Sequence, residues 1–170
     1  FDDVYAMRPD QLQLGFLKVL KGSGMREDAP GYGINWHERA PYEVLTTDWL
    51  SYGDVLLLKG VEDMVEVYYN SRQFDRTISK IMERYASPFL FFKELADFYD
   101  REGLAGIGHA RIARYEILRR FLSEEKGWEL KEYEQCMVLD LYARENLKSR
   151  PAFAPDLSPY KEQLKIMTRE

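Results

Sequence analysis

Apolar residues recur at helical spacing over most of the chain after Thr46, and this periodicity constrains the fold more than any other feature. The first stripe follows Ser51 and Asp54, which form a capping box with Asp where Glu is more usual. Its members are Val55, Leu58, Val61, Met64, Val65 and Tyr68. The spacing therefore predicts a helix that begins after Ser51 and ends near Tyr69.

Further apolar stripes follow, and short capping or breaking signals separate them. The second stripe comes after Asn70 and Ser71, which offer a stop and a new cap, and it runs over 74–85. Ser87 and Pro88 then form another helix start. The remaining predicted helices are 88–102, closed by Gly103, then 108–122 and 129–147, with a short terminal helix at 159–167. We therefore expect a mainly α fold, a helical bundle of about five helices.

Residues 1–43 do not share this pattern, because glycine and proline interrupt any long element. Within them, the stretch QLQLGFLKVLKGSG allows two interpretations. Polar and apolar residues alternate over 11–16, as in a strand. Helical spacing instead groups Leu12, Phe16, Val19 and Leu20. A lone strand exposes unpaired backbone, whereas Asp10 and Gly22 can cap a helix, so the helix over 11–21 is favoured.

The segment 11–35 is therefore predicted to be strand-like or helical and then to continue as an irregular loop. The chain divides on this basis into an N-terminal segment, 1–43, and a helical domain, 44–170.

Composition narrows the class of protein. The 170 residues are 45% hydrophobic, enough for a packed core, and the net charge of -5 argues against a general nucleic-acid binder. Cys136 is the single cysteine, so no internal disulfide forms, which fits a reducing compartment and a cytoplasmic location. No apolar run approaches the roughly 20 residues of a membrane helix, so we expect no membrane partner.

Side chains that often carry chemistry are present, but they are not grouped in motifs. Cys136 lies at apolar spacing, which favours a structural thiol over a nucleophile. His37 and His109 lie far apart and show no metal-ligand spacing with another His or Cys. The acidic residues of the helical region lack the Glu-x-x-His motif of di-metal bundles. The sequence therefore predicts no catalytic and no metal-binding residue.

Two of the predicted helices have distinctive surfaces. Helix 88–102 is crowded with aromatic residues, for which core packing is favoured over a face that meets another domain. Helix 108–122 is locally basic, through Arg111, Arg114, Arg119 and Arg120. A solvated face is favoured over a docking face for a partner or an RNA backbone.

Four phrases of the chain together resemble a known domain. They are LQLGFLKVLKGSGM (12–25), PYEVLTTDWLSYGD (41–54), VEVYYNSRQF (65–74) and SPFLFF (87–92). In combination they are similar to the C-terminal domain of unknown function of cobalamin-binding radical S-adenosylmethionine proteins, an Fe–S oxidoreductase family. That family's Cys-x-x-x-Cys-x-x-Cys motif is absent here, and the chain starts at Phe1. The resemblance implies a barrel upstream, with a 4Fe-4S cluster, S-adenosylmethionine and cobalamin in the parent and no cofactor in this part.

The resemblance also gives a role to the opening stretch. In related enzymes a strand ending in a Pro-Gly-Thr-like turn closes the barrel, and Lys21-Gly22-Ser23 would replace that turn. Gln13 and Gly15 would then face the barrel interior, and Lys18 or Lys21 would contact an anionic ligand group. The implied cofactor-binding set, in the full-length parent only, is Gln13, Gly15, Lys18, Lys21 and Gly22.

The resemblance implies a non-catalytic accessory domain that shapes or covers the active-site mouth of a radical S-adenosylmethionine enzyme. Its partner would be the barrel of the same chain, and formation of a homo-oligomer is a further alternative. The alternative is a free-standing helical interaction module that binds through helix 88–102 or helix 108–122. A small-molecule enzyme with its own site has no supporting motif in the sequence.

Overall fold

The computed structural model describes residues 1–144 and 151–155, and the fold over these residues is mainly α. Seven α-helices and one two-stranded sheet lie in this part of the chain. In chain order they are α1 (Asp2–Ala6), α2 (Gly24–Asp28), β1 (Asn35–Trp36), β2 (Val44–Thr46), α3 (Tyr52–Val65), α4 (Asp75–Met82), α5 (Pro88–Arg101), α6 (Arg111–Arg120) and α7 (Lys131–Arg144). A turn of π-helix extends α3 over Glu66–Asn70, and another extends α6 over Phe121–Glu125.

The predicted mainly α class is confirmed, and α3 to α7 correspond to the predicted helical segments. The short helices α1 and α2 were not predicted. The predicted terminal helix at 159–167, and the last residues of the predicted helix 129–147, lie outside the described residues.

The chain forms two compact units. The first consists of Phe1–Arg72 and Met82–Ile107, and the second of Gln73–Ile81 and Gly108–Glu170. The proposed boundary at residue 43 concerns a link to an upstream barrel, and it stays a prediction.

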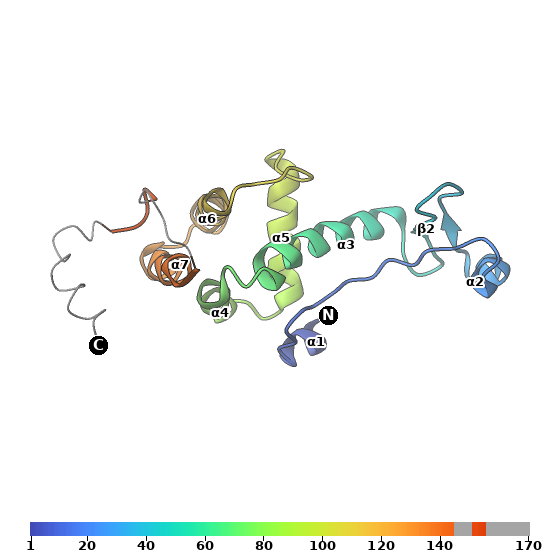
Figure 1. Cartoon of the computed structure of the whole chain (residues 1–170), viewed down its shortest axis with the longest axis horizontal. Helices are drawn as coiled ribbons and strands as arrows, with labels where there is room; N and C mark the ends of the chain where they lie inside the picture. The colour runs from blue at the N-terminus through green and yellow to red at the C-terminus, as the bar shows by residue number, and fades with distance from the viewer. Residues whose placement is uncertain (145–150, 156–170) are drawn as a thin grey trace. The chain divides into compact units, whose positions relative to one another are not determined.

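In the first unit, α3 crosses α5 and their facing side chains form the core (Figure 1). The contact is close, because a Cβ on Gly60 would lie 3.1 Å from the Cβ of Ala96. The phenol oxygens of Tyr68 and Tyr99 lie 2.7 Å apart and share a buried hydrogen bond. The aromatic side chains that α5 buries are Phe91, Phe92, Phe98 and Tyr99. The prediction that these aromatics serve core packing is therefore confirmed.

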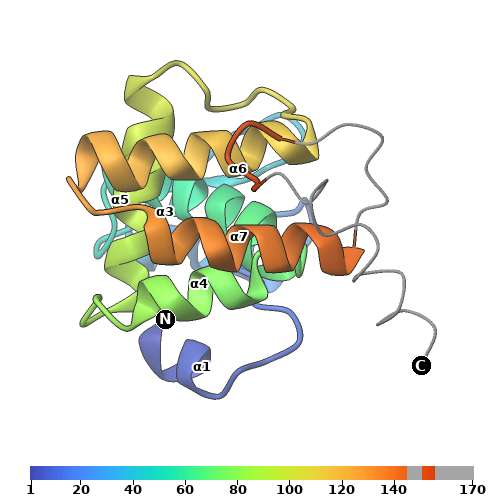
Figure 2. The ribbon, with the colours of Figure 1, turned by 90° about the vertical axis from the view of Figure 1, so that its left-hand side faces the viewer.

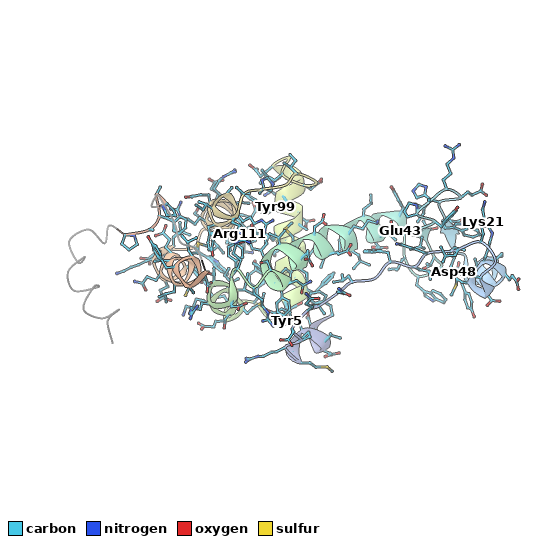
Figure 3. The ribbon with its side chains drawn as sticks, in the orientation of Figure 1. Tyr5, Lys21, Glu43, Asp48, Tyr99 and Arg111 are labelled. Carbon is cyan, nitrogen blue, oxygen red and sulfur yellow. The ribbon has the colours of Figure 1, made fainter. Side chains whose placement is uncertain are left out.

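A second, smaller core lies near the start of the chain. It consists of Val19, Ala29, Ile34 and Val44, with Trp36 packed against it. Strands β1 and β2 pair antiparallel, with Asn35 opposite Thr46. The carboxylate of Asp48 lies over Gly33, whose φ is +58°, so any side chain there would clash. Figure 3 shows Lys21, Glu43 and Asp48 gathered around α2 and β2.

The favoured helix over 11–21 is wrong. The segment is extended, and Lys18 forms a single antiparallel bridge with Glu43. The N–H of Val19 donates to the carbonyl of Tyr42 at 2.8 Å, and that of Val44 donates to Leu17 at 2.9 Å. The sequence favours the helix because it shows no partner for a lone strand. In the structure, residues 42–44 at the start of β2 supply that partner.

In the second unit, α4, α6 and α7 lie side by side (Figure 2). The rings of Phe74 and Tyr115 pack at 4.4 Å, and the Tyr115 hydroxyl donates to the carbonyl of Gln73 at 2.9 Å. Asp140 of α7 is buried and accepts hydrogen bonds from the first turn of α4. Cys136 is half-buried on α7, and not fully enclosed.

Candidate docking surface

The five residues assigned to a cofactor site all lie on the extended segment or in the turn after it. Gln13, Gly15, Lys18, Lys21 and Gly22 are exposed. Between them the apolar side chains turn inward, since Leu12 is buried and Phe16 is half-buried. The predicted alternation over 11–16 is thus present in the structure. The roles of the five residues in a full-length parent stay predictions.

The end of α3 holds the start of this segment through side chains that the sequence did not single out for that purpose. Asn70 accepts the N–H of Leu12 at 2.8 Å and donates to the Leu12 carbonyl at 3.1 Å, as a neighbouring strand would. The Tyr69 hydroxyl donates to the Pro9 carbonyl at 2.5 Å. The Arg72 guanidinium pairs with the exposed carboxylate of Asp10 at 3.1 Å.

Replacing Asn70 with alanine is expected to lower the free energy of unfolding by about 2 kcal/mol, because the N–H and the carbonyl of Leu12 each lose a partner in a partly buried place. Amide hydrogen exchange at Leu12 should accelerate at the same time. The matched control is Gln13→Ala, which removes an exposed amide from the same segment and should change stability by less than about 0.5 kcal/mol. Equal effects of the two changes would contradict this role for Asn70.

Further along the segment, Phe16 covers a charged pair. The Lys59 ammonium lies 4.9 Å from the centre of the Phe16 ring and bonds the Glu43 carboxylate. Phe16 and Lys59 thus hold the segment against α3, and the lysine is already engaged by Glu43. Glu62 lies one turn after Lys59 on α3, and burial, followed by the nearby charge of Asp63, raises its pKa.

Tyr5, near the start of the chain, is half-buried. Its ring packs against that of Tyr69 at a separation of 5.2 Å and against that of Phe92 at 6.1 Å. Burial, followed by the nearby Tyr69, raises the pKa of Tyr5 to about 12. The ring contacts show that Tyr5 serves packing.

Exposed apolar residues follow one another from the loop after β2 into the start of α3. We call them, with Tyr32, the Trp49 surface, and its residues are Tyr32, Trp49, Leu50, Tyr52 and Leu56. Trp49 is 74% exposed, although large aromatic side chains normally bury most of their area, and its ring lies 6.1 Å from that of Tyr32. Exposed apolar side chains that lie together often mark surfaces that meet another protein or domain.

Hydrogen bonds hold the backbone around Trp49. The Thr47 hydroxyl oxygen accepts the N–H of Trp49 at 3.1 Å and that of Leu50 at 3.0 Å. The N–H of Asp48 donates to the Tyr32 carbonyl, and the rings of Tyr32 and Trp49 lie 6.1 Å apart. A tryptophan whose backbone is fixed before binding loses less conformational freedom when a partner covers it.

Other candidate surfaces are weaker. On α6, Arg119 pairs with Glu116 and Glu134, and Arg120 pairs with Glu124. Their charge is thus largely neutralised, which favours the solvated face over a docking face for RNA.

Residues 1–144 and 151–155 present neither a metal site nor a membrane-spanning helix. This part of the chain contains no group of three or more His, Cys, Asp or Glu side chains placed to hold a metal ion. Nor does any helix in it combine the length and the apolar character that a membrane crossing requires.

Over the described residues the fold is mainly α, and it presents the exposed Trp49 surface. The family model described as "Protein of unknown function (DUF4080)" matches residues 30–170. Because the match covers most of the chain, the protein belongs to this family. No curated protein and no solved structure matches the chain.

Proposed function

We propose that the chain is a non-catalytic C-terminal accessory domain of a cobalamin-dependent-type radical S-adenosylmethionine enzyme. It would shape or cover the mouth of the active site and so control substrate access. The phrases over 12–25 and 41–54 support this through their resemblance to such domains. The parent would contain the 4Fe-4S cluster, S-adenosylmethionine and cobalamin, and its barrel would be the partner of this domain.

The Trp49 surface is the observation that carries the proposal. It belongs to the N-terminal part of the chain, which would be nearest in sequence to the proposed upstream barrel. Tryptophan and tyrosine are the residues that most often anchor interfaces, especially where they are ordered before contact. An ordered tryptophan that is 74% exposed fits a surface that another domain covers.

A free-standing interaction module is the second candidate, and the same surface would serve it. The open reading frame separates the two candidates. A Cys-x-x-x-Cys-x-x-Cys motif upstream of Phe1 supports the accessory domain, and a start codon next to Phe1 supports the module. Anaerobic assays of S-adenosylmethionine cleavage add a second criterion. The full-length protein should form 5′-deoxyadenosine, whereas cleavage by the 170-residue chain alone would overturn the non-catalytic role.

In the full-length protein, Trp49→Ser is expected to accelerate proteolytic release of this domain by at least about tenfold. The reason is that a buried interface tryptophan contributes about 2 kcal/mol or more to docking. The rate is measured by limited proteolysis, with the released fragment followed on gels.

The matched control for this prediction is Ile107→Ser, which replaces another exposed apolar residue of the same unit, 58% exposed in the loop after α5. In the isolated 170-residue chain, both changes should leave the free energy of unfolding within about 0.5 kcal/mol. If Trp49→Ser and Ile107→Ser release the domain at the same rate, the Trp49 surface does not dock the barrel.

A further inference from the structure

An open cavity of about 730 Å³ lies in the second unit, between α7 and residues 152–155. Its volume falls in the range of roughly 300–1,000 Å³ that small-molecule sites occupy. The cavity belongs to the second unit and the Trp49 surface to the first, and the proposed accessory role does not use the cavity. The groups on its walls indicate what it would bind.

The walls of the cavity are mainly apolar, and one of them packs against α6. Val138 and Leu139 of α7 form one side, and Phe153 forms the other. The Phe153 ring packs 5.8 Å from the Tyr115 ring, and the Arg119 guanidinium lies 5.8 Å from the centre of the Phe153 ring. The side that Phe153 forms is thus fixed by contacts with α6.

The polar groups of the cavity are unequal in charge. Glu134 accepts from the Nε of Arg119 at 2.8 Å and from the Nη2 at 2.7 Å, so its charge is neutralised. Lys131 and Gln135, one turn apart on α7, have no hydrogen bond or ion pair within the described residues. The lining therefore offers one ammonium and one amide beside an apolar wall.

We propose that this cavity binds an amphiphilic monocarboxylate. The carboxylate would pair with the Lys131 ammonium and the Gln135 amide, and the aliphatic body would cover Val138, Leu139 and Phe153. A cationic head is disfavoured, because Glu134, the acidic group of the lining, is already paired with Arg119. This inference goes beyond the proposed function and does not depend on it.

The test is calorimetric titration of the 170-residue chain with decanoate, below its micellar concentration, and with decanol and decylamine as head-group controls. We expect saturable binding of one decanoate, with a Kd of about 1 mM or tighter for a ligand of this size. Decanol should bind about fivefold more weakly, because it has no charge to form an ion pair with Lys131, and decylamine more weakly still, because its ammonium is repelled by that of Lys131.

Three variants locate the site. Lys131→Gln should weaken decanoate binding about fivefold and leave decanol binding unchanged. Leu139→Asp should weaken all three ligands, and the fold should tolerate it because Leu139 is exposed. Arg39→Gln, which removes an exposed cation of the first unit, should change nothing. The proposal is overturned if decanoate gives no saturable heat, if decylamine binds as tightly as decanoate, or if Arg39→Gln weakens binding as much as Lys131→Gln.

Discussion

Replacing Asp140 with alanine is expected to lower the free energy of unfolding by about 3 kcal/mol. One oxygen of this buried carboxylate accepts the N–H of Thr77 at 2.8 Å and the Thr77 hydroxyl at 2.8 Å. The other accepts the N–H of Arg76 at 3.1 Å. Alanine would leave these first-turn donors of α4 without acceptors in a buried place, and each such donor costs about 1–3 kcal/mol.

The measurement is urea unfolding followed by circular dichroism. Asp140→Asn should lower the free energy of unfolding by less than Asp140→Ala does, because the asparagine side chain keeps one acceptor oxygen. Asp97→Ala is the matched control, since Asp97 is exposed and pairs only with Lys93 of its own helix, so the loss should stay below about 0.5 kcal/mol. A change of under 1 kcal/mol for Asp140→Ala would show that water replaces the carboxylate.

The helix ends that the sequence placed correctly depend on neighbouring residues alone. Ser51 and Asp54 form the predicted capping box, with the Asp54 N–H donating to the Ser51 hydroxyl at 3.2 Å. Ser87 accepts the N–H of Leu90, and Gly103 follows α5 with a φ of +66°. Caps of this kind connect residues three or four positions apart, so a single sequence contains the whole signal.

The ends that the sequence misplaced depend on distant residues. Ser71 does not begin a helix, since α4 starts at Asp75. The Ser71 hydroxyl instead donates back to the Val67 carbonyl. The acceptor at that start is Asp140, which follows Thr77 by 63 positions. Asn70 holds Leu12 across a separation of 58 positions. No local pattern predicts such pairs, and for the same reason the sequence pattern predicts a helix over 11–21 where the structure has an extended segment.

The Trp49 surface had a sequence signal, although helical periodicity does not find it. Trp49 stands just before the Ser51 cap and belongs to no apolar stripe. A large aromatic residue outside every stripe has no predicted place in the core, and the structure leaves it exposed. The cavity beside α7 could not be predicted, because residues 152–155 contact α6 only through the tertiary fold.

Gly60→Leu is expected to lower the free energy of unfolding by about 3 kcal/mol, because the crossing of α3 and α5 depends on the missing side chain at this position. A Cβ on residue 60 would lie 3.1 Å from the Ala96 Cβ, closer than two methyl carbons pack without a shift. A leucine must therefore separate the two helices or force neighbouring side chains off their rotamers, which costs about 1–3 kcal/mol or more.

Gly53 of the same helix supplies the control for this prediction. Its Cβ would meet only the Ser51 hydroxyl at 3.6 Å, so Gly53→Leu should be neutral or stabilising by up to about 1 kcal/mol through helix propensity. Urea unfolding of both variants gives the comparison, and equal losses would show that α3 and α5 do not depend on close approach.

A double-mutant cycle then isolates the contact itself. Gly60→Ala gains helix propensity but crowds Ala96, so the two effects nearly cancel. Combining it with Ala96→Gly removes the crowding, and the pair should show a favourable coupling of about 1 kcal/mol relative to the sum of the single changes. A coupling near zero would place the strain of Gly60→Leu elsewhere on α3, because residues in contact normally depart from additivity by about 0.5 kcal/mol or more.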